Sequence, residues 1–186
     1  MVKTKIIVFV LALVMLLGGC DKDALKKLSY PDDFKTLVVK YSNENNLNPY
    51  LVFGIIKRES KFMHKAESSK GARGLMQLTE ATAKWVAEFS GMNNFDYEDI
   101  FEPSVNIRLG CAYFAHLLEA YSGNVPLALC AYNAGSGNIN SWLDEGIISK
   151  SDFDSEKIPF EETRKYVKDV MDYAKVYEQL YPEIVQ

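Results

Sequence analysis

The sequence has few cysteines and histidines and no excess of positive charge, and each scarcity removes a class of function. Three cysteines and two histidines occur in 186 residues. None are grouped at metal-ligand spacing, so we expect no metal and no other cofactor. Twenty-one basic residues stand against 25 acidic ones, for a formal net charge of -4. Nucleic acid is therefore not a predicted partner, because phosphate binding relies on clustered Lys and Arg.

Signals for β-structure are also missing. No stretch alternates apolar and polar residues for long enough to predict a strand, whereas helical spacing recurs, as at Phe34, Leu37, Val38 and Tyr41. Together with a hydrophobic fraction of 48% and no internal repeat, this predicts one all-α domain, which we expect to be monomeric. Further helices are predicted from residue 49, over 79–89, 103–121, 126–131, 140–143 and about 161–180.

The first residues are typical of an export signal and not of a folded domain. Lys3 and Lys5 precede an apolar run over residues 6–17, and small residues then lead to Cys20. The segment 17–20, Leu-Gly-Gly-Cys, resembles a bacterial lipobox, which implies cleavage and lipidation of Cys20. An ordinary signal peptide and an uncleaved anchor helix are the alternatives. All three place the protein outside the cytoplasm.

The lipobox interpretation divides the chain into three parts. We expect a signal peptide over 1–19, a lipid-anchored tether over 20–31 and one catalytic domain over 32–186. The expected location is the bacterial cell envelope, attached to a membrane through lipidated Cys20 and facing the periplasm or cell wall. The remaining cysteines, Cys111 and Cys130, lie in apolar helical patterns, and two buried thiols are favoured over a disulfide.

Glu59 does not match the pattern of its own helix. Val52, Ile55 and Ile56 form an apolar stripe on the helix that begins at Pro49, and helical spacing extends this stripe to Glu59. Partial burial disfavours a charged carboxylate, so we expect the pKa of Glu59 to exceed its ordinary value of about 4.3. A glutamate that stays protonated near neutral pH suits a general acid. Taken alone, Glu59 is equally consistent with an exposed helix end or a salt bridge.

Four short blocks change that balance. They are Arg-Glu-Ser over 58–60, Gly-Ala-Arg-Gly-Leu-Met-Gln over 71–77, Ala-Tyr-Asn-Ala-Gly over 131–135, and the segment 158–167 beginning Ile-Pro-Phe-Glu-Glu-Thr-Arg. In this order they resemble the soluble lytic transglycosylase family. The resemblance implies a goose-type lysozyme-like, largely helical fold around a glycan-binding cleft, with Glu59 as the one catalytic acid and base.

The resemblance also assigns a substrate-binding set. Plainer interpretations exist for several members: Met76 and Tyr166 fit a core, and Glu162 fits the dipole of a helix N-terminus. For the serine of the loop before Gly71, Ser69 is an alternative to Ser68. The assigned residues are Ser60, Ser68, Met76, Gln77, Tyr132, Asn133, Glu162 and Tyr166.

The implied activity is cleavage of peptidoglycan glycan strands between N-acetylmuramic acid and N-acetylglucosamine, leaving 1,6-anhydro ends. Two rival functions remain open at this stage. A hydrolytic muramidase on the same fold would use water, and a non-catalytic peptidoglycan-binding lipoprotein would cut nothing.

Overall fold

A computed structural model describes residues 22–92 and 94–185 of the protein. These residues belong to two units that divide between Pro31 and Asp32, and each is described by itself. In the described part of the first unit lies helix α2 (Lys22–Ser29), so most of the expected tether is helical. The predicted signal peptide and Cys20 lie outside the described residues. No helix in the described ranges has the length and apolar character needed to cross a membrane.

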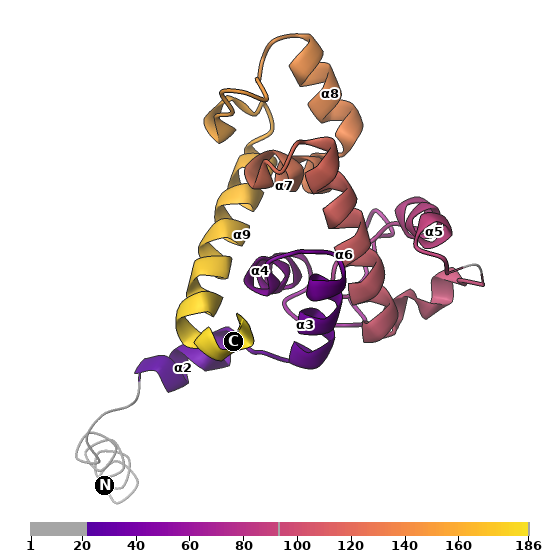
Figure 1. Cartoon of the computed structure of the whole chain (residues 1–186), viewed down its shortest axis with the longest axis vertical. Helices are drawn as coiled ribbons and strands as arrows, with labels where there is room; N and C mark the ends of the chain where they lie inside the picture. The colour runs from indigo at the N-terminus through magenta and orange to yellow at the C-terminus, as the bar shows by residue number, and fades with distance from the viewer. Residues whose placement is uncertain (1–21, 93, 186) are drawn as a thin grey trace, which may run out of the picture. The chain divides into compact units, whose positions relative to one another are not determined.

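The second unit is built from helices, as predicted (Figure 1). Among its described residues the only β-pairings are isolated bridges that join Arg73 to Glu67 and to Leu78. In chain order the helices are α3 (Lys35–Glu44), α4 (Pro49–Glu59), α5 (Glu80–Phe89), η1 (Tyr97–Phe101), α6 (Pro103–Ala120), α7 (Val125–Ala134), α8 (Ser136–Asp144), η2 (Ser155–Lys157), α9 (Glu161–Leu180) and η3 (Pro182–Val185).

Helix α4 forms the centre of this unit. It begins where the sequence predicts, because Asn48 accepts a hydrogen bond from the Tyr50 amide and Pro49 occupies the first helical position. Every residue from Pro49 to Ile56 is buried, so the helix is covered on all sides and not only along its predicted stripe. In Figure 1 α4 is seen nearly end-on with other helices of the unit around it.

The main partner of α4 is α9, and a glycine brings the two helices together. A Cβ added to Gly54 would lie 2.7 Å from the Val170 carbonyl oxygen of α9. This is closer than real Cβ atoms approach, so only glycine permits the observed packing. The close contact fixes α9 against the helix that carries Glu59.

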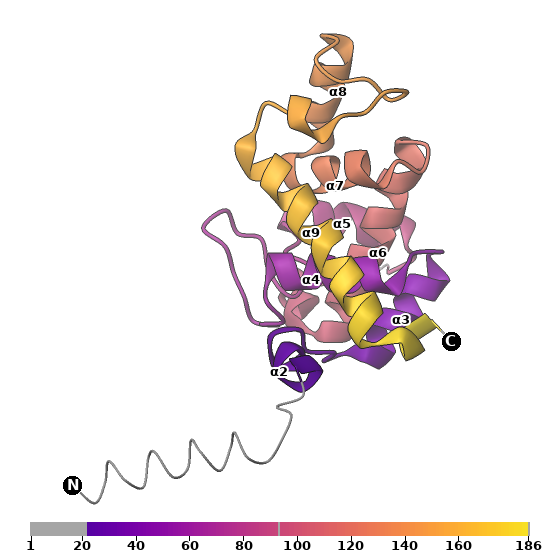
Figure 2. The ribbon, with the colours of Figure 1, turned by 90° about the vertical axis from the view of Figure 1, so that its left-hand side faces the viewer.

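The connection from α4 to α5 is a long loop that extends to one side of the helices in Figure 2. Its path turns sharply after Ser60, because Lys61 and Phe62 both have left-handed backbones, with φ of 52° and 67°. The ring of Phe62 then packs near Phe53 and Tyr177, at centroid distances of 6.1 and 6.3 Å. This contact ties the start of the loop to α4 and α9.

A buried asparagine shapes the end of the same loop. Asn106 of α6 is fully buried; its Oδ1 accepts from the Met76 amide at 2.7 Å, and its Nδ2 donates to the Arg73 and Ile100 carbonyls. Gly74 has φ of 80°, and a Cβ there would lie 2.0 Å from the Asn106 amide nitrogen. Glycine is needed at position 74 for two reasons: the turn requires a positive φ, and α6 leaves no room for a Cβ atom.

The two cysteines of the domain are buried free thiols, as the sequence favoured. Burial raises the pKa of Cys111 and of Cys130 to about 12. Both behave as small apolar side chains of the core.

We expect Gly54→Ala to lower the free energy of unfolding by about 1–3 kcal/mol, because the new methyl group must push α4 away from α9. The matched control is Gly137→Ala in α8, where an added Cβ meets nothing within 4 Å. Urea unfolding of both variants compares them directly. Equal stabilities would contradict a tight α4–α9 contact.

Candidate active site

Glu59 is the last residue of α4, and its side chain is half-buried. The pKa of its carboxyl is raised to about 7, mainly by burial and to a small extent by the negative charge of Glu162. Hydrogen bonding by Tyr166 and the positive charge of Arg58 lower the pKa, but less than burial raises it. The burial and raised pKa that the apolar stripe predicted for Glu59 are both present. Near neutral pH a large fraction of this carboxyl therefore carries its proton.

Tyr166 approaches Glu59 from α9. Its side chain is buried, and burial together with the Glu59 charge raises the pKa of its phenol well above 10. The hydroxyl meets no partner at standard hydrogen-bond geometry within the described residues, yet it lies near enough to Glu59 to act on that pKa. Tyr166 therefore remains a neutral donor that faces the acid.

Arg58, the residue before Glu59, holds Tyr166 in place. Its guanidinium lies 5.4 Å from the centre of the Tyr166 ring. Its Nε lies 3.2 Å from an Asp169 carboxylate oxygen, and both side chains are largely shielded from solvent. Asp169 could not be assigned a role from the sequence, because nothing in its local pattern shows that it meets Arg58 across two helices.

Tyr132 of α7 also lies near the acid. Its hydroxyl donates to the Met76 carbonyl at 2.7 Å, which links α7 to the loop before α5. Burial, then the charge of Glu59, raises the pKa of Tyr132 well above its ordinary value. The phenol oxygen is thus fixed near Glu59 and remains neutral.

Asn133 follows Tyr132 and is oriented by a residue that the sequence analysis missed. Thr163 of α9 is buried, and its hydroxyl donates to the Asn133 Oδ1 at 2.8 Å. With its oxygen engaged, Asn133 presents its amide hydrogens. Thr163 belongs to the quoted Glu-Glu-Thr-Arg block, so the motif contained the signal.

Gln77 shows the converse arrangement. Its backbone is left-handed, with φ of 48°, and its Nε2 donates to the carbonyls of Gly74 at 2.8 Å and Ala66 at 3.1 Å. The amide nitrogen is therefore engaged by the loop, which presents the side-chain oxygen as an acceptor.

Two residues of the predicted binding set are buried. Ser60 is buried, and its hydroxyl donates to the Ile56 carbonyl at 3.2 Å. Met76 is fully buried against α6, where a Cβ on Gly110 would lie 2.2 Å from its sulfur. Both residues support the structure: Ser60 ends α4, and the Met76 carbonyl holds Tyr132. Their binding of substrate stays a prediction.

The other two members of the set differ in position. Ser68 is half-buried in a tight turn, where its hydroxyl accepts from the Ala72 amide at 3.1 Å. Glu162 is exposed in the first turn of α9 and lies close enough to Glu59 to act on its pKa. Glu162 is also one helical turn before Tyr166, so both share one face of α9.

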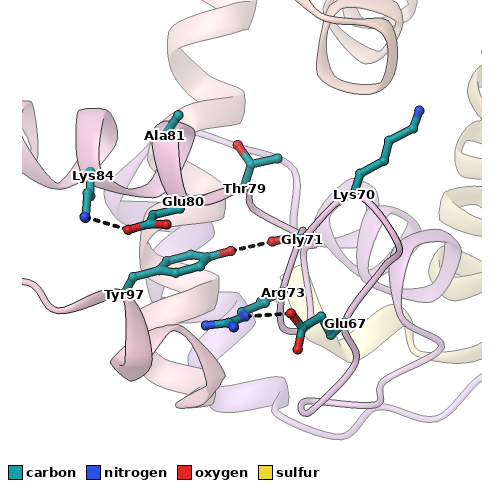
Figure 3. A pocket seen from close by; sticks show the side chains of 9 residues that line it. All are labelled: Glu67, Lys70, Gly71, Arg73, Thr79, Glu80, Ala81, Lys84 and Tyr97. Atoms are coloured by element: carbon teal, nitrogen blue, oxygen red, sulfur yellow. Dashed lines mark hydrogen bonds and ion pairs between the residues drawn. The ribbon is translucent and has the colours of Figure 1, made fainter.

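Next to the loop that carries Gln77 is an open pocket of about 560 Å³, drawn in Figure 3. Its charged groups are mostly paired: Arg73 with Glu67 at 3.1 Å, and Lys84 with Glu80 at 2.6 Å. The Lys70 side chain extends away from these pairs. The described residues contain no group of three or more His, Cys, Asp or Glu arranged to hold a metal ion.

An all-helical domain in which one half-buried glutamate lies near two neutral tyrosines has the architecture of the lysozyme-like glycan-cleaving enzymes. Comparison with known sequences agrees with this class. Residues 36–151 match the family of the transglycosylase SLT domain, and residues 157–184 match the soluble lytic transglycosylase helical domain. The chain belongs to the transglycosylase SLT domain family.

The relatives have names of the same kind. The soluble lytic murein transglycosylase of Escherichia coli K12 is 32% identical over 153 residues, which cover 81% of this chain and 23% of that protein. The membrane-bound lytic murein transglycosylase F of Pseudoalteromonas translucida is 34% identical over 134 residues, or 66% of this chain and 26% of the relative. The chain spans about a quarter of the length of these relatives.

Solved structures show the same fold. An inactive Glu-to-Gln mutant of lytic transglycosylase Slt from Pseudomonas aeruginosa matches with a TM-score of 0.74 and 36% identity, over 82% of this chain and 25% of that one. The 70-kDa soluble lytic transglycosylase in complex with bulgecin A matches with a TM-score of 0.75 and 29% identity, over the same shares. The predicted lysozyme-like all-α fold is confirmed.

The raised pKa of Glu59 has a consequence for stability. Between about pH 4.5 and about pH 7 the unfolded chain loses this proton while the folded chain keeps it, so stability falls as pH rises through that window. Glu59→Gln cannot ionise. We therefore expect it to be more stable than wild type at pH 8, by at most about 3 kcal/mol, with little difference at pH 4.

Thermal and urea unfolding at both pH values measure this difference. Glu119→Gln, which alters an exposed carboxylate of α6, is the matched control and should show no such pH-dependent gain. A Glu59→Gln variant with the same advantage at pH 4 and pH 8 would show that Glu59 is an ordinary solvated carboxylate.

Proposed function

We propose that this protein is a peptidoglycan lytic transglycosylase that cleaves the β-1,4 bond between N-acetylmuramic acid and N-acetylglucosamine and leaves 1,6-anhydro ends. The observation that carries the proposal is the protonatable Glu59, with a pKa of about 7, among neutral hydrogen-bonding groups. Family membership and the names of the relatives support the same activity.

In the first step the protonated Glu59 gives its proton to the glycosidic oxygen that leaves the N-acetylmuramic acid. Positive charge develops at the sugar C1, and the acetamido group of the substrate itself stabilises it. Tyr132 and Tyr166 stay neutral beside the acid because the pKa of each phenol is far above neutrality. They support the carboxylate that forms without supplying a competing charge.

In the second step the Glu59 carboxylate accepts the proton of the sugar C6 hydroxyl, and the C6 oxygen closes onto C1. The atoms balance without water, because the proton that Glu59 gave is replaced by the one it receives. An internal hydroxyl held in position gains greatly from proximity over a free water molecule.

Gln77 and Asn133 are suited to orient the sugar. The oxygen of Gln77 can accept from a sugar hydroxyl or amide, and the amide hydrogens of Asn133 can donate to a carbonyl or hydroxyl. Glu162, exposed near Glu59, is placed to bind polar substituents from α9. Ser68 lies on the same loop as Gln77.

A hydrolytic muramidase is the second candidate, and Glu162 is the observation that favours it. Hydrolases commonly pair an acid with a second carboxylate that activates water, and Glu162 is the carboxylate near Glu59. The products separate the two reactions, since hydrolysis leaves reducing ends and cyclisation leaves anhydro ends.

We also propose that the protein acts in the bacterial envelope as a lipid-anchored monomer. The Leu-Gly-Gly-Cys segment would supply the anchor at Cys20. Some relatives are called membrane-bound. An anchored enzyme would act on the peptidoglycan within reach of one membrane.

We expect Glu59→Gln to fold but to lose activity by about 10²–10⁴-fold, because the general acid is gone. The measurement is digestion of purified peptidoglycan followed by mass spectrometry of the muropeptides. Anhydro ends from wild type support the transglycosylase and reducing ends support the muramidase.

The matched control is Glu161→Gln, which changes the exposed neighbour of Glu162 on α9 and should retain activity. Wild-type turnover by Glu59→Gln would remove the catalytic assignment. An inert wild-type protein that still binds sacculi would identify a non-catalytic binding lipoprotein.

We expect Cys20→Ser to move the protein from the membrane fraction to the soluble fraction while purified protein keeps its specific activity. The anchor would be lost, but Cys20 is separate in sequence from every residue of the site. Metabolic labelling with a fatty acid tests the attachment directly. A labelled Cys20→Ser protein would contradict lipidation at this position.

A further inference from the structure

Helix α5 presents two large exposed aromatic side chains, which nothing in the proposed chemistry uses. Trp85 is 43% exposed and Phe89 is 51% exposed, one helical turn apart. The face of α5 that packs into the core is formed by other residues, Ala83, Val86 and Ala87. The two aromatic rings are therefore not required to fill the core.

The rings form an ordered cluster with His116 of α6. The Trp85 ring lies 5.1 Å from that of Phe89 and 4.9 Å from that of His116, in edge-to-face arrangements at 71° and 86°. Phe89 and His116 are 5.7 Å apart. Contacts among three rings from two helices fix this surface, which we call the Trp85 platform and define as Trp85, Phe89 and His116.

A series of ring contacts joins the platform to the candidate active site. Tyr113 of α6 lies 6.2 Å from Trp85 and 5.1 Å from Tyr132. Tyr132 in turn lies close enough to Glu59 to feel its charge. Trp85 is thus connected through Tyr113 to Tyr132, which lies near Glu59.

A polar pocket borders the same helix. Thr79, Ala81 and Lys84 line the pocket of Figure 3, and Ala81 is one helical turn before Trp85 on α5. A second pocket, of about 580 Å³, is lined by Phe89 and His116 of the platform together with Ser90, Arg108 and Glu119. Aromatic rings and polar groups therefore lie side by side at the platform.

We propose that the Trp85 platform is a stacking subsite for a pyranose ring of the glycan strand, distant from the bond that is cut. The inference rests on the proposed function. Pyranose rings present C–H faces that stack on aromatic rings and polar edges that need hydrogen bonds, which matches a platform beside a polar pocket. Two exposed rings form a small patch, bordered by charged side chains of α5 and α6, so its size suits one sugar better than a protein partner.

A subsite distant from the cut has a distinct effect on binding. Short oligomers that occupy the cleavage centre do not reach Trp85, whereas long strands do. Trp85 therefore increases affinity for long substrates only, and it selects for strand length without taking part in bond cleavage.

The test measures binding without turnover, in the full-length protein carrying Glu59→Gln. Trp142→Phe is added because Trp142 is the other tryptophan and is nearly buried, so the remaining fluorescence reports Trp85. The probes are β-1,4-linked N-acetylglucosamine trimer and octamer. We expect the octamer to change the fluorescence and the trimer to leave it unaltered.

Calorimetry of variants in the Glu59→Gln background then measures affinity. We expect Trp85→Ala to weaken octamer binding by about threefold to tenfold, as loss of one aromatic contact should, with trimer binding unchanged. Trp85→Phe should recover much of the affinity. Ile147→Ala, which removes an exposed apolar side chain elsewhere, is the matched control and should have no effect.

Unchanged octamer affinity in Trp85→Ala would overturn the subsite, and so would equal losses for trimer and octamer, since these would report general damage. The result is separable from the proposed function. Peptidoglycan cleavage by wild type together with unchanged octamer affinity in Trp85→Ala rejects the subsite alone. Trp85-dependent octamer binding by a protein that never cleaves glycan rejects the enzyme alone.

Discussion

Burial of one carboxyl group at the end of α4 is the constraint on which the site depends. A solvated glutamate would be almost fully ionised at pH 7 and could not give a proton, whereas Glu59 has a pKa of about 7 because protein atoms replace much of its water. Residues 49–56 of the same helix are all buried, so α4 is held in place and Glu59 with it. The packing of a helix thus sets the chemistry of one side chain.

Close helix packing also brings the partners of Glu59 to it from distant parts of the chain. Gly54 lets α9 approach α4, and Tyr166 on α9 then faces the acid. The loop before α5 reaches the site because Asn106 holds the Met76 amide, and the Met76 carbonyl fixes Tyr132. Each contact joins two segments that are remote in sequence, so the site is a product of the fold and not of one motif.

Local patterns predicted most of the helices, whereas contacts between helices could not be predicted from them. Caps and apolar spacing located α4 and α9, since Asn48-Pro49 and the stripe of residues 161–180 are local signals. The helix predicted over 140–143 is longer, Ser136–Asp144, because the positive φ of Gly135 separates it from α7 and Gly137 is tolerated inside it. The pairing of Arg58 with Asp169 and the platform around Trp85 depend on tertiary contact, so no local pattern contained them.

The placement of Arg58 shows how the structure keeps its acid protonatable. Arg58 is adjacent to Glu59 in sequence, and a direct ion pair would hold the pKa of the carboxyl low and abolish its use as an acid. The guanidinium is instead held by Asp169 at 3.2 Å and lies over the Tyr166 ring. Its charge reaches Glu59 only as a minor influence, while burial dominates. Asp169 therefore contributes to the site indirectly, because it forms an ion pair with Arg58, the cation adjacent to Glu59 in the sequence.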